Sequence, residues 1–202
     1  MKTAKALLVH PPIASLPWDD RRGTASMLMF ISTEAMLFVS LFFGYFYLGA
    51  HQDKWPMDEP PKMLLATILL VILVASSGVM FAAEQASKAG RSGVARALLG
   101  LVIVMGVVFM VIQTFEYKDH LQHLRPTTDA YGSMFYTITS LHALHVIVGL
   151  GMLCYVFVLP DLEGKIRPPH RPLHNAGLYW HFVDTVWVFV VLLLYYLPNV
   201  SG

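Results

Sequence analysis

The sequence has little charge and almost no cysteine. Asp, Glu, Lys and Arg make up 13% of the 202 residues, about half the share in ordinary soluble domains, whereas 56% are hydrophobic. So little polar surface cannot cover a globule in water, which excludes a soluble enzyme. The formal net charge of +1 gives no sign of a nucleic-acid partner. The single cysteine, Cys154, excludes a disulfide framework, a zinc ribbon and an iron–sulfur cluster.

Long stretches nearly free of charge predict an all-α membrane protein. Residues 63–83, 97–115 and 130–160 contain no Asp, Glu, Lys or Arg, and residues 23–52 contain only Glu34. After Arg171 the only such residue is Asp184. A spanning helix needs about 20 apolar residues, and continuous rather than alternating apolar character favours helices over strands. We therefore predict one domain of five transmembrane helices over residues 24–198, at about 24–50, 62–86, 95–118, 131–159 and 175–198, with residues 1–23 as an interfacial arm.

The distribution of Lys and Arg predicts the orientation. If the N-terminus is cytoplasmic, ten of the 14 basic residues lie on the cytoplasmic side: Lys2, Lys5, Arg21, Arg22, Lys88, Arg91, Arg96, Lys165, Arg167 and Arg171. The other side has Lys54, Lys62, Lys118 and Arg125. Basic residues gather on the cytoplasmic side of membrane proteins. The sequence therefore predicts a cytoplasmic N-terminus and a periplasmic C-terminus in a multi-pass protein of the bacterial inner membrane.

Five ionisable residues fall at one depth within the predicted helices. A rise of about 1.5 Å per residue places Glu34, His142, His145, His181 and Asp184 in the cytoplasmic half of the bilayer. Both His142/His145 and His181/Asp184 are spaced i, i+3, so each pair shares a helix face. Ionisable groups at this depth are costly and require a reason. We expect Glu84 and Glu116, in contrast, to lie near the membrane surfaces where water solvates them.

Two other interpretations of these residues remain open at this point. Buried histidines often only satisfy hydrogen bonds between helices, so the five groups could form a purely structural network. Histidine with a carboxylate could also ligate iron or zinc. Di-iron bundles, however, use Glu-x-x-His pairs, whereas the pairs here are His-x-x-His and His-x-x-Asp, so we predict no metal ligand.

Four segments resemble subunit III of cytochrome c oxidase, in the order and on the helices of that family. They are FISTEAMLFVSLFFGYF (30–46), GVVFMVIQTFEY (106–117), YGSMFYTITSLHALHVIVG (131–149) and YWHFVDTVWVF (179–189). The resemblance runs from about Thr24 to Pro198. Mitochondrial members have seven helices, and this chain resembles the shorter bacterial form that lacks the first two.

The resemblance implies a non-redox accessory subunit. Such a chain binds no haem or copper, which belong to subunits I and II, and has no catalytic residue of its own. It packs on subunit I, binds structural phospholipid between helices, supports proton uptake and prolongs the working life of the catalytic subunit. The family pattern implies a buried polar seam of Glu34, His142, His145, His181 and Asp184 between helices one, four and five.

Two further groups of residues follow from the resemblance and the charge pattern. Gln113, Glu116 and Tyr117 match the family's third-helix motif near the outer surface. Basic residues at the cytoplasmic helix ends are candidates for holding anionic lipid head groups, and plain topology signalling explains them equally well. These are Arg21, Arg22, Arg91 and Arg96.

Alternative functions lie inside and outside this superfamily. The nearest alternatives are the third subunit of a quinol oxidase and an accessory protein of nitric oxide reductase. Subunit II recognises the electron donor, so the sequence of this chain distinguishes these complexes only weakly. A standalone proton-coupled transporter using Glu34, His145 and Asp184 is more distant. Transporters commonly show repeated halves and discontinuous helices, and neither is visible in this sequence.

Overall fold

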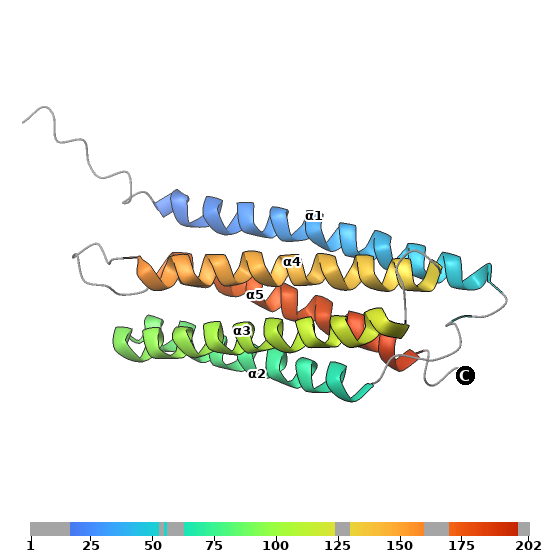
Figure 1. Ribbon diagram of the computed structural model, residues 1–202. Helices are drawn as coiled ribbons and strands as arrows, with labels where there is room; N and C mark the ends of the chain where they lie inside the picture. The colour runs from blue at the N-terminus through green and yellow to red at the C-terminus, as the bar shows by residue number, and fades with distance from the viewer. Residues whose placement is uncertain (1–16, 53–54, 56–62, 124–129, 160–169, 198–202) are drawn as a thin grey trace, which may run out of the picture.

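The computed structural model describes residues 17–52, 55, 63–123, 130–159 and 170–197 (Figure 1). Within these residues five long α-helices follow one another along the chain. They are α1 (Pro17–Ala50), α2 (Met63–Lys88), α3 (Ser92–His123), α4 (Ala130–Val158) and α5 (His170–Val190), which continues into a π-helix, η2 (Val191–Tyr196). All five are long and apolar enough to cross a membrane. A helix suits this setting because it satisfies every backbone polar group internally. The described chain thus confirms the prediction of five spanning helices.

Several helices extend beyond the apolar stretches that identified them, and α5, for example, begins at His170, five residues before its predicted start. α1 begins at Pro17, within the segment predicted as an arm, and α3 continues to His123. Proline fits the first turn of a helix because no intrahelical partner is needed for its missing N–H. Residues 1–16, the rest of the predicted arm, lie outside the described part of the chain.

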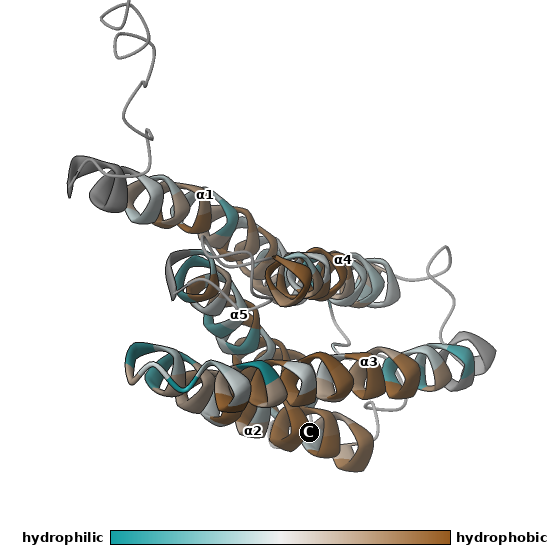
Figure 2. Ribbon diagram, turned by 90° about the vertical axis from the view of Figure 1, so that its left-hand side faces the viewer, coloured by the Kyte–Doolittle hydropathy of each residue, from teal (hydrophilic) through white to brown (hydrophobic). Residues whose placement is uncertain are grey.

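The helices form two pairs with α5 between them. α2 packs along α3, and α1 packs along α4, while α5 contacts α1, α2 and α4 (Figures 1 and 2). Only 6% of the apolar stretch of α1 is buried, against 56% of that in the span Pro172–Tyr196. α5 is therefore the central helix, and α1 lies at the periphery with most of its surface exposed.

A tight turn joins α2 to α3. Gly90 has a φ of 72°, a conformation that glycine adopts without strain. The Gly90 N–H donates to the Ser87 carbonyl at 3.1 Å, and the Arg91 N–H donates to the Ala86 carbonyl at 2.9 Å. This pattern is a Schellman motif, which ends α2 and lets α3 start at once in the opposite direction.

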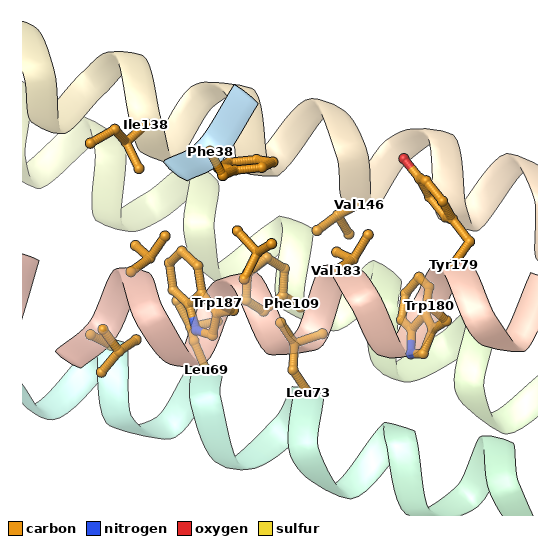
Figure 3. Close-up of a cluster of buried hydrophobic side chains, with 14 of the residues drawn as sticks. Phe38, Leu69, Leu73, Phe109, Ile138, Val146, Tyr179, Trp180, Val183 and Trp187 are labelled. Atoms are coloured by element: carbon orange, nitrogen blue, oxygen red, sulfur yellow. The ribbon is translucent and has the colours of Figure 1, made fainter. Parts of the chain in front are cut away.

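The hydrophobic core is built around two tryptophans of α5. Trp180 and Trp187 are fully buried, and the Trp187 ring meets Phe109 of α3 edge-on at 5.2 Å between centroids (Figure 3). A Cβ at Gly106 would lie 2.7 Å from both the Trp180 ring and Leu150. Glycine at this position therefore lets α3 approach α4 and α5 closely, as small residues do in membrane bundles.

Candidate functional site: buried polar groups within the membrane spans

Glu34 of α1 and His145 of α4 form a bonded acid–imidazole pair. Glu34 Oε2 lies 3.1 Å from His145 Nε2, and His145 Nδ1 lies 2.7 Å from the Leu141 carbonyl oxygen. A carbonyl only accepts hydrogen bonds, so Nδ1 carries a proton and donates it to Leu141. The bond from Nε2 to Glu34 then needs a second proton, either on the carboxyl group or on the ring. The pair consequently holds one proton more than a carboxylate beside a neutral imidazole.

The surroundings of this pair are largely apolar but not closed. The side chains of Glu34 and His145 are 22% and 10% exposed, so the pair reaches the outer surface of the bundle between α1 and α4. The Phe38 ring meets the imidazole edge-on at 5.0 Å, and the Tyr179 hydroxyl donates to the His145 backbone carbonyl at 3.4 Å. Tyr179 thereby connects the pair to α5.

His181 and Asp184 of α5 bond to α2 rather than to α1 or α4. Ser77 Oγ lies 2.7 Å from His181 Nδ1 and donates to Asp184 Oδ2 at 2.5 Å. With the single serine hydroxyl proton directed to Asp184, His181 Nδ1 donates to Ser77, and a protonated Asp184 would reverse both bonds. The three side chains form a directed chain of hydrogen bonds that ends on a buried carboxyl group.

A second acid–imidazole pair, which the sequence analysis did not propose, joins the same two helices. His174 Nδ1 lies 3.0 Å from Glu84 Oε2, and the Glu84 side chain is 9% exposed. A Cβ at Gly177 would run into this carboxyl group, so glycine makes room for it. The expectation that water solvates Glu84 is therefore wrong.

The sequence does contain a signal for this pair. Ser77 and Glu84 are seven residues apart on α2, and His174 and His181 are seven residues apart on α5. Seven residues are close to two helical turns, so each pair of positions returns to one helix face. When two such faces meet on neighbouring antiparallel helices, Ser77 lies opposite His181 and Glu84 lies opposite His174.

His142 is buried beside the core tryptophan and is not part of either acid–imidazole pair. Its ring stacks on Trp187 with 4.7 Å between centroids and an interplanar angle of 27°. Neither ring nitrogen has a hydrogen-bond partner among the described residues. His142 and His145 share a face of α4 in sequence, but the structure puts them in different surroundings.

The third-helix motif lies at the end of the bundle where α4 begins. Glu116 is buried, and its Oε1 accepts a hydrogen bond from the Tyr195 hydroxyl at 3.1 Å, so the expectation that water solvates Glu116 is wrong as well. Tyr117 donates to Ser140 Oγ at 3.4 Å. Gln113 is buried, and its amide has no partner within the described chain.

The π-helix η2 carries two consecutive tyrosines that contact different helices. Its backbone closes with a bond from the Leu197 N–H to the Leu192 carbonyl, five residues back. Tyr195 bonds to Glu116 of α3, while the hydroxyl of Tyr196 lies 3.1 Å from Thr67 Oγ1 of α2. The end of the fifth span is thereby connected to both helices.

Two of the four candidate lipid-binding arginines have described side chains. The Arg96 guanidinium lies over the Phe157 ring at 4.7 Å, linking the start of α3 to the end of α4. Arg91 is exposed at the α2–α3 turn. Arg21 and Arg22 fall in the first turns of α1, and their side chains lie outside the described part of the structure.

Within the described residues, hydrogen bonds join the buried polar groups into separate sets. Among the described residues, no hydrogen bond connects the Glu34–His145 pair to the Ser77–His181–Asp184 chain. In the same part of the molecule, no group of three His, Cys, Asp or Glu side chains is arranged to hold a metal ion. The arrangement is suited to holding protons inside the bundle and to bracing pairs of helices.

Comparison with known proteins points to one family. A family model described as cytochrome c oxidase subunit III matches residues 21–199. A protein named cytochrome c oxidase subunit 3 from Synechocystis sp. is 32% identical over 174 residues, covering 85% of this chain and 74% of the relative. Its namesake from Thermostichus vulcanus is 31% identical over 175 residues, covering 86% of both chains. The namesake from Alkalihalophilus pseudofirmus is 28% identical over 204 residues, covering 99% of this chain and 97% of the relative.

Proposed function

The chain belongs to the cytochrome c oxidase subunit III family, and on this premise we propose that it is a non-redox accessory subunit of a respiratory terminal oxidase. It sits in the inner membrane of a bacterium as a multi-pass protein, with its N-terminus in the cytoplasm. Haem and copper are held by the partner subunits, and this chain binds neither. Its role is to support proton uptake and to prolong the working life of the catalytic subunit.

The proposed main contact is with subunit I, in the complex that also contains subunit II. The exposure of α1 supports this, because a spanning helix with 6% of its apolar stretch buried offers a long surface to a neighbour. Large apolar side chains face outward along it at seven-residue spacing: Met29, Met36 and Phe43. Such a spacing gives one continuous face for a second helix.

Phospholipid is the proposed second partner. The α2 surface has a shallow, open apolar depression lined by Leu64, Thr67, Ile68, Val71 and Ile72. These residues lie inside a membrane-spanning helix, where an acyl chain is the natural occupant. The depression lies near the start of α2, and the α2–α3 turn is at the opposite end of that helix. Basic residues near that turn would supply charges for the anionic head groups of other lipids.

The Glu34–His145 bond carries the proton-uptake part of the proposal. The hydrogen-bond geometry requires a proton on one of the two groups, and the pair reaches the surface between α1 and α4. When the pair passes this proton to a neighbouring subunit, it is left as a carboxylate beside a neutral imidazole. That single negative charge is costly in lipid and favours uptake of another proton by the pair. The Glu84–His174 pair offers a second proton-holding site at another helix pair.

Purification tests the accessory role. We expect an affinity-tagged chain to bring down haem-containing subunits from the membrane, and the chain separated from them to show no haem absorption. Oxygen reduction by the complex without this chain should continue but decay sooner during turnover. Stoichiometric haem on the separated chain, or a chain that sits alone in the membrane, would contradict the proposal.

Glu34→Gln tests the proton role. Glutamine donates a hydrogen bond to His145 Nε2 but cannot release a proton, so we expect slower proton uptake by a complex that assembles normally. Thr33→Ala is the control, because the Thr33 hydroxyl bonds only to the Phe30 carbonyl of its own helix. Unchanged proton uptake in the Glu34→Gln complex, or poor assembly as its only defect, would show that the pair is merely structural.

A further inference from the structure

His142 and Gln113 are buried polar side chains whose hydrogen-bonding atoms are all unused. Their exposed fractions are 1% and 2%. Both ring nitrogens of His142 and both amide atoms of Gln113 are inaccessible and have no hydrogen-bond partner within the described residues. Buried polar atoms in proteins nearly always have a partner, and an exception calls for an explanation. Inside a membrane span the requirement is stricter, because bulk water is absent.

The two side chains belong to one place in the bundle. The Phe109 ring of α3 meets the His142 ring of α4 at 5.9 Å and the Trp187 ring of α5 at 5.2 Å, both nearly perpendicular. Gln113 follows Phe109 by four residues, which is about 6 Å further along the same face of α3. Trp187 covers one face of the His142 ring and leaves the plane of the ring, in which its nitrogens bond, uncovered.

We propose that the interface of α3, α4 and α5 is a water-binding site, in which ordered water bonds to His142 and Gln113. The donor and acceptor groups fit this ligand. A neutral imidazole offers one donor and one acceptor, and the amide offers two donors and an acceptor oxygen. Water complements both because it donates and accepts, and a buried water typically makes about three hydrogen bonds. All the groups are neutral, so a neutral ligand leaves no uncompensated charge.

Buried polar side chains also lie on α3 between this site and the end of the span. Glu116 is three residues beyond Gln113 on α3, toward the end of the span, and it bonds to Tyr195. The carboxyl, the amide and the imidazole thus follow one another from the end of the bundle to its middle. The water site is distinct from the Glu34–His145 pair, so it does not depend on the proposed proton role of that pair.

A map of the intact oxidase complex at a resolution that resolves water tests the proposal directly. We expect density for water within hydrogen-bonding distance of a His142 ring nitrogen and of the Gln113 amide. A direct bond between His142 and Gln113, or a map without water density at these atoms, would overturn the proposal. This measurement needs no substitution, so it does not depend on the folding of a variant.

A double-variant cycle gives an independent test. His142→Phe keeps an aromatic ring against Trp187 but removes both nitrogens, and Gln113→Leu removes the amide. If water bridges the two, each single substitution lowers the midpoint of thermal unfolding of the complex, and the double variant is about as stable as the less stable single one. Additive effects, or single variants that raise the midpoint because they remove an unsatisfied group, would contradict the proposal.

Thr139→Val is the matched control for this cycle. Thr139 is as buried as His142, but its hydroxyl is satisfied by the Phe135 carbonyl of its own helix at 2.7 Å. Its substitution should therefore show no coupling to Gln113→Leu. Coupling of the same size in the control pair would mean that the cycle reports general repacking, and the water site would lose this support.

Discussion

Ser77 of α2 donates a 2.5 Å hydrogen bond to Asp184 of α5, across the interface of two membrane-spanning helices. Asp184 is 4% exposed, and its other carboxyl oxygen, Oδ1, has no partner among the described residues. The serine hydroxyl is therefore the side-chain donor on which this buried acid depends. The Ser77 hydroxyl thus stabilises the Asp184 carboxyl group inside a membrane span.

Ser77→Ala should destabilise the protein by about 1–3 kcal/mol, because it leaves a buried acceptor unsatisfied. Unfolding of the purified complex in detergent would measure the loss. Ser40→Ala is the control, since the Ser40 hydroxyl is exposed and bonds only to the Met36 carbonyl of its own helix. Equal effects of the two substitutions would show that Asp184 does not depend on Ser77.

Glu34 and His145 should be energetically coupled. Interhelical hydrogen bonds in membrane proteins contribute about 0.6 kcal/mol on average, with a maximum near 1.7 kcal/mol. A double-mutant cycle of Glu34→Ala and His145→Ala should return a coupling in this range. Thr33→Ala combined with His145→Ala is the reference cycle and should be additive. A coupling of zero in the first cycle would mean that the 3.1 Å contact contributes nothing to stability.

Gly106→Ala should separate α3 from α4 and α5. The added Cβ would lie 2.7 Å from both Leu150 and Trp180, so the helices must shift, and overpacking of this kind costs about 1–3 kcal/mol. Gly78→Ala is the matched control, because nothing lies within 4 Å of a Cβ there. We expect the control to be neutral or slightly stabilising, since alanine favours a helix more than glycine does. A Gly106→Ala protein as stable as the Gly78→Ala control would refute the close approach of α3 to α4 and α5 at this position.

Tyr195→Phe should cost about 1–2 kcal/mol, because it removes a buried donor from the Glu116 carboxyl group. Tyr196→Phe removes an equivalent hydroxyl from the next residue, but the Tyr196–Thr67 contact is exposed. The expected loss there is smaller, because water replaces the partner. Thermal unfolding of the two variants side by side provides the comparison. A larger loss of stability for Tyr196→Phe would contradict the conclusion that the Tyr195–Glu116 bond is the more important of the two.

The number and approximate position of the helices could be predicted from the sequence because lipid excludes charge. The exact ends could not be. The charges in the segment before Thr24 mark where the lipid ends, but a helix continues in water as long as its backbone bonds are made, and α1 begins at Pro17. The continuation of α3 to His123 has the same cause.

The positions of the buried polar residues along their helices could likewise be predicted, whereas their partners could not. Counting residues along a helix gives a level in the membrane, but the rotation of each helix about its axis is set by packing. Asp184 therefore bonds to Ser77 of α2 rather than to the other ionisable residues at its level. Glu84 was expected in water for the same reason, and its partner His174 becomes visible only when α2 and α5 are placed side by side.

The central position of α5 has a consequence for biogenesis. Ribosomes synthesise chains from the N-terminus, so the helix that all the others pack against is the last of the five to leave the exit tunnel. Until it inserts, Glu84, Ser77 and Glu116 lack His174, Asp184 and Tyr195 as partners. The four earlier spans therefore enter the bilayer before these three interhelical hydrogen bonds can form.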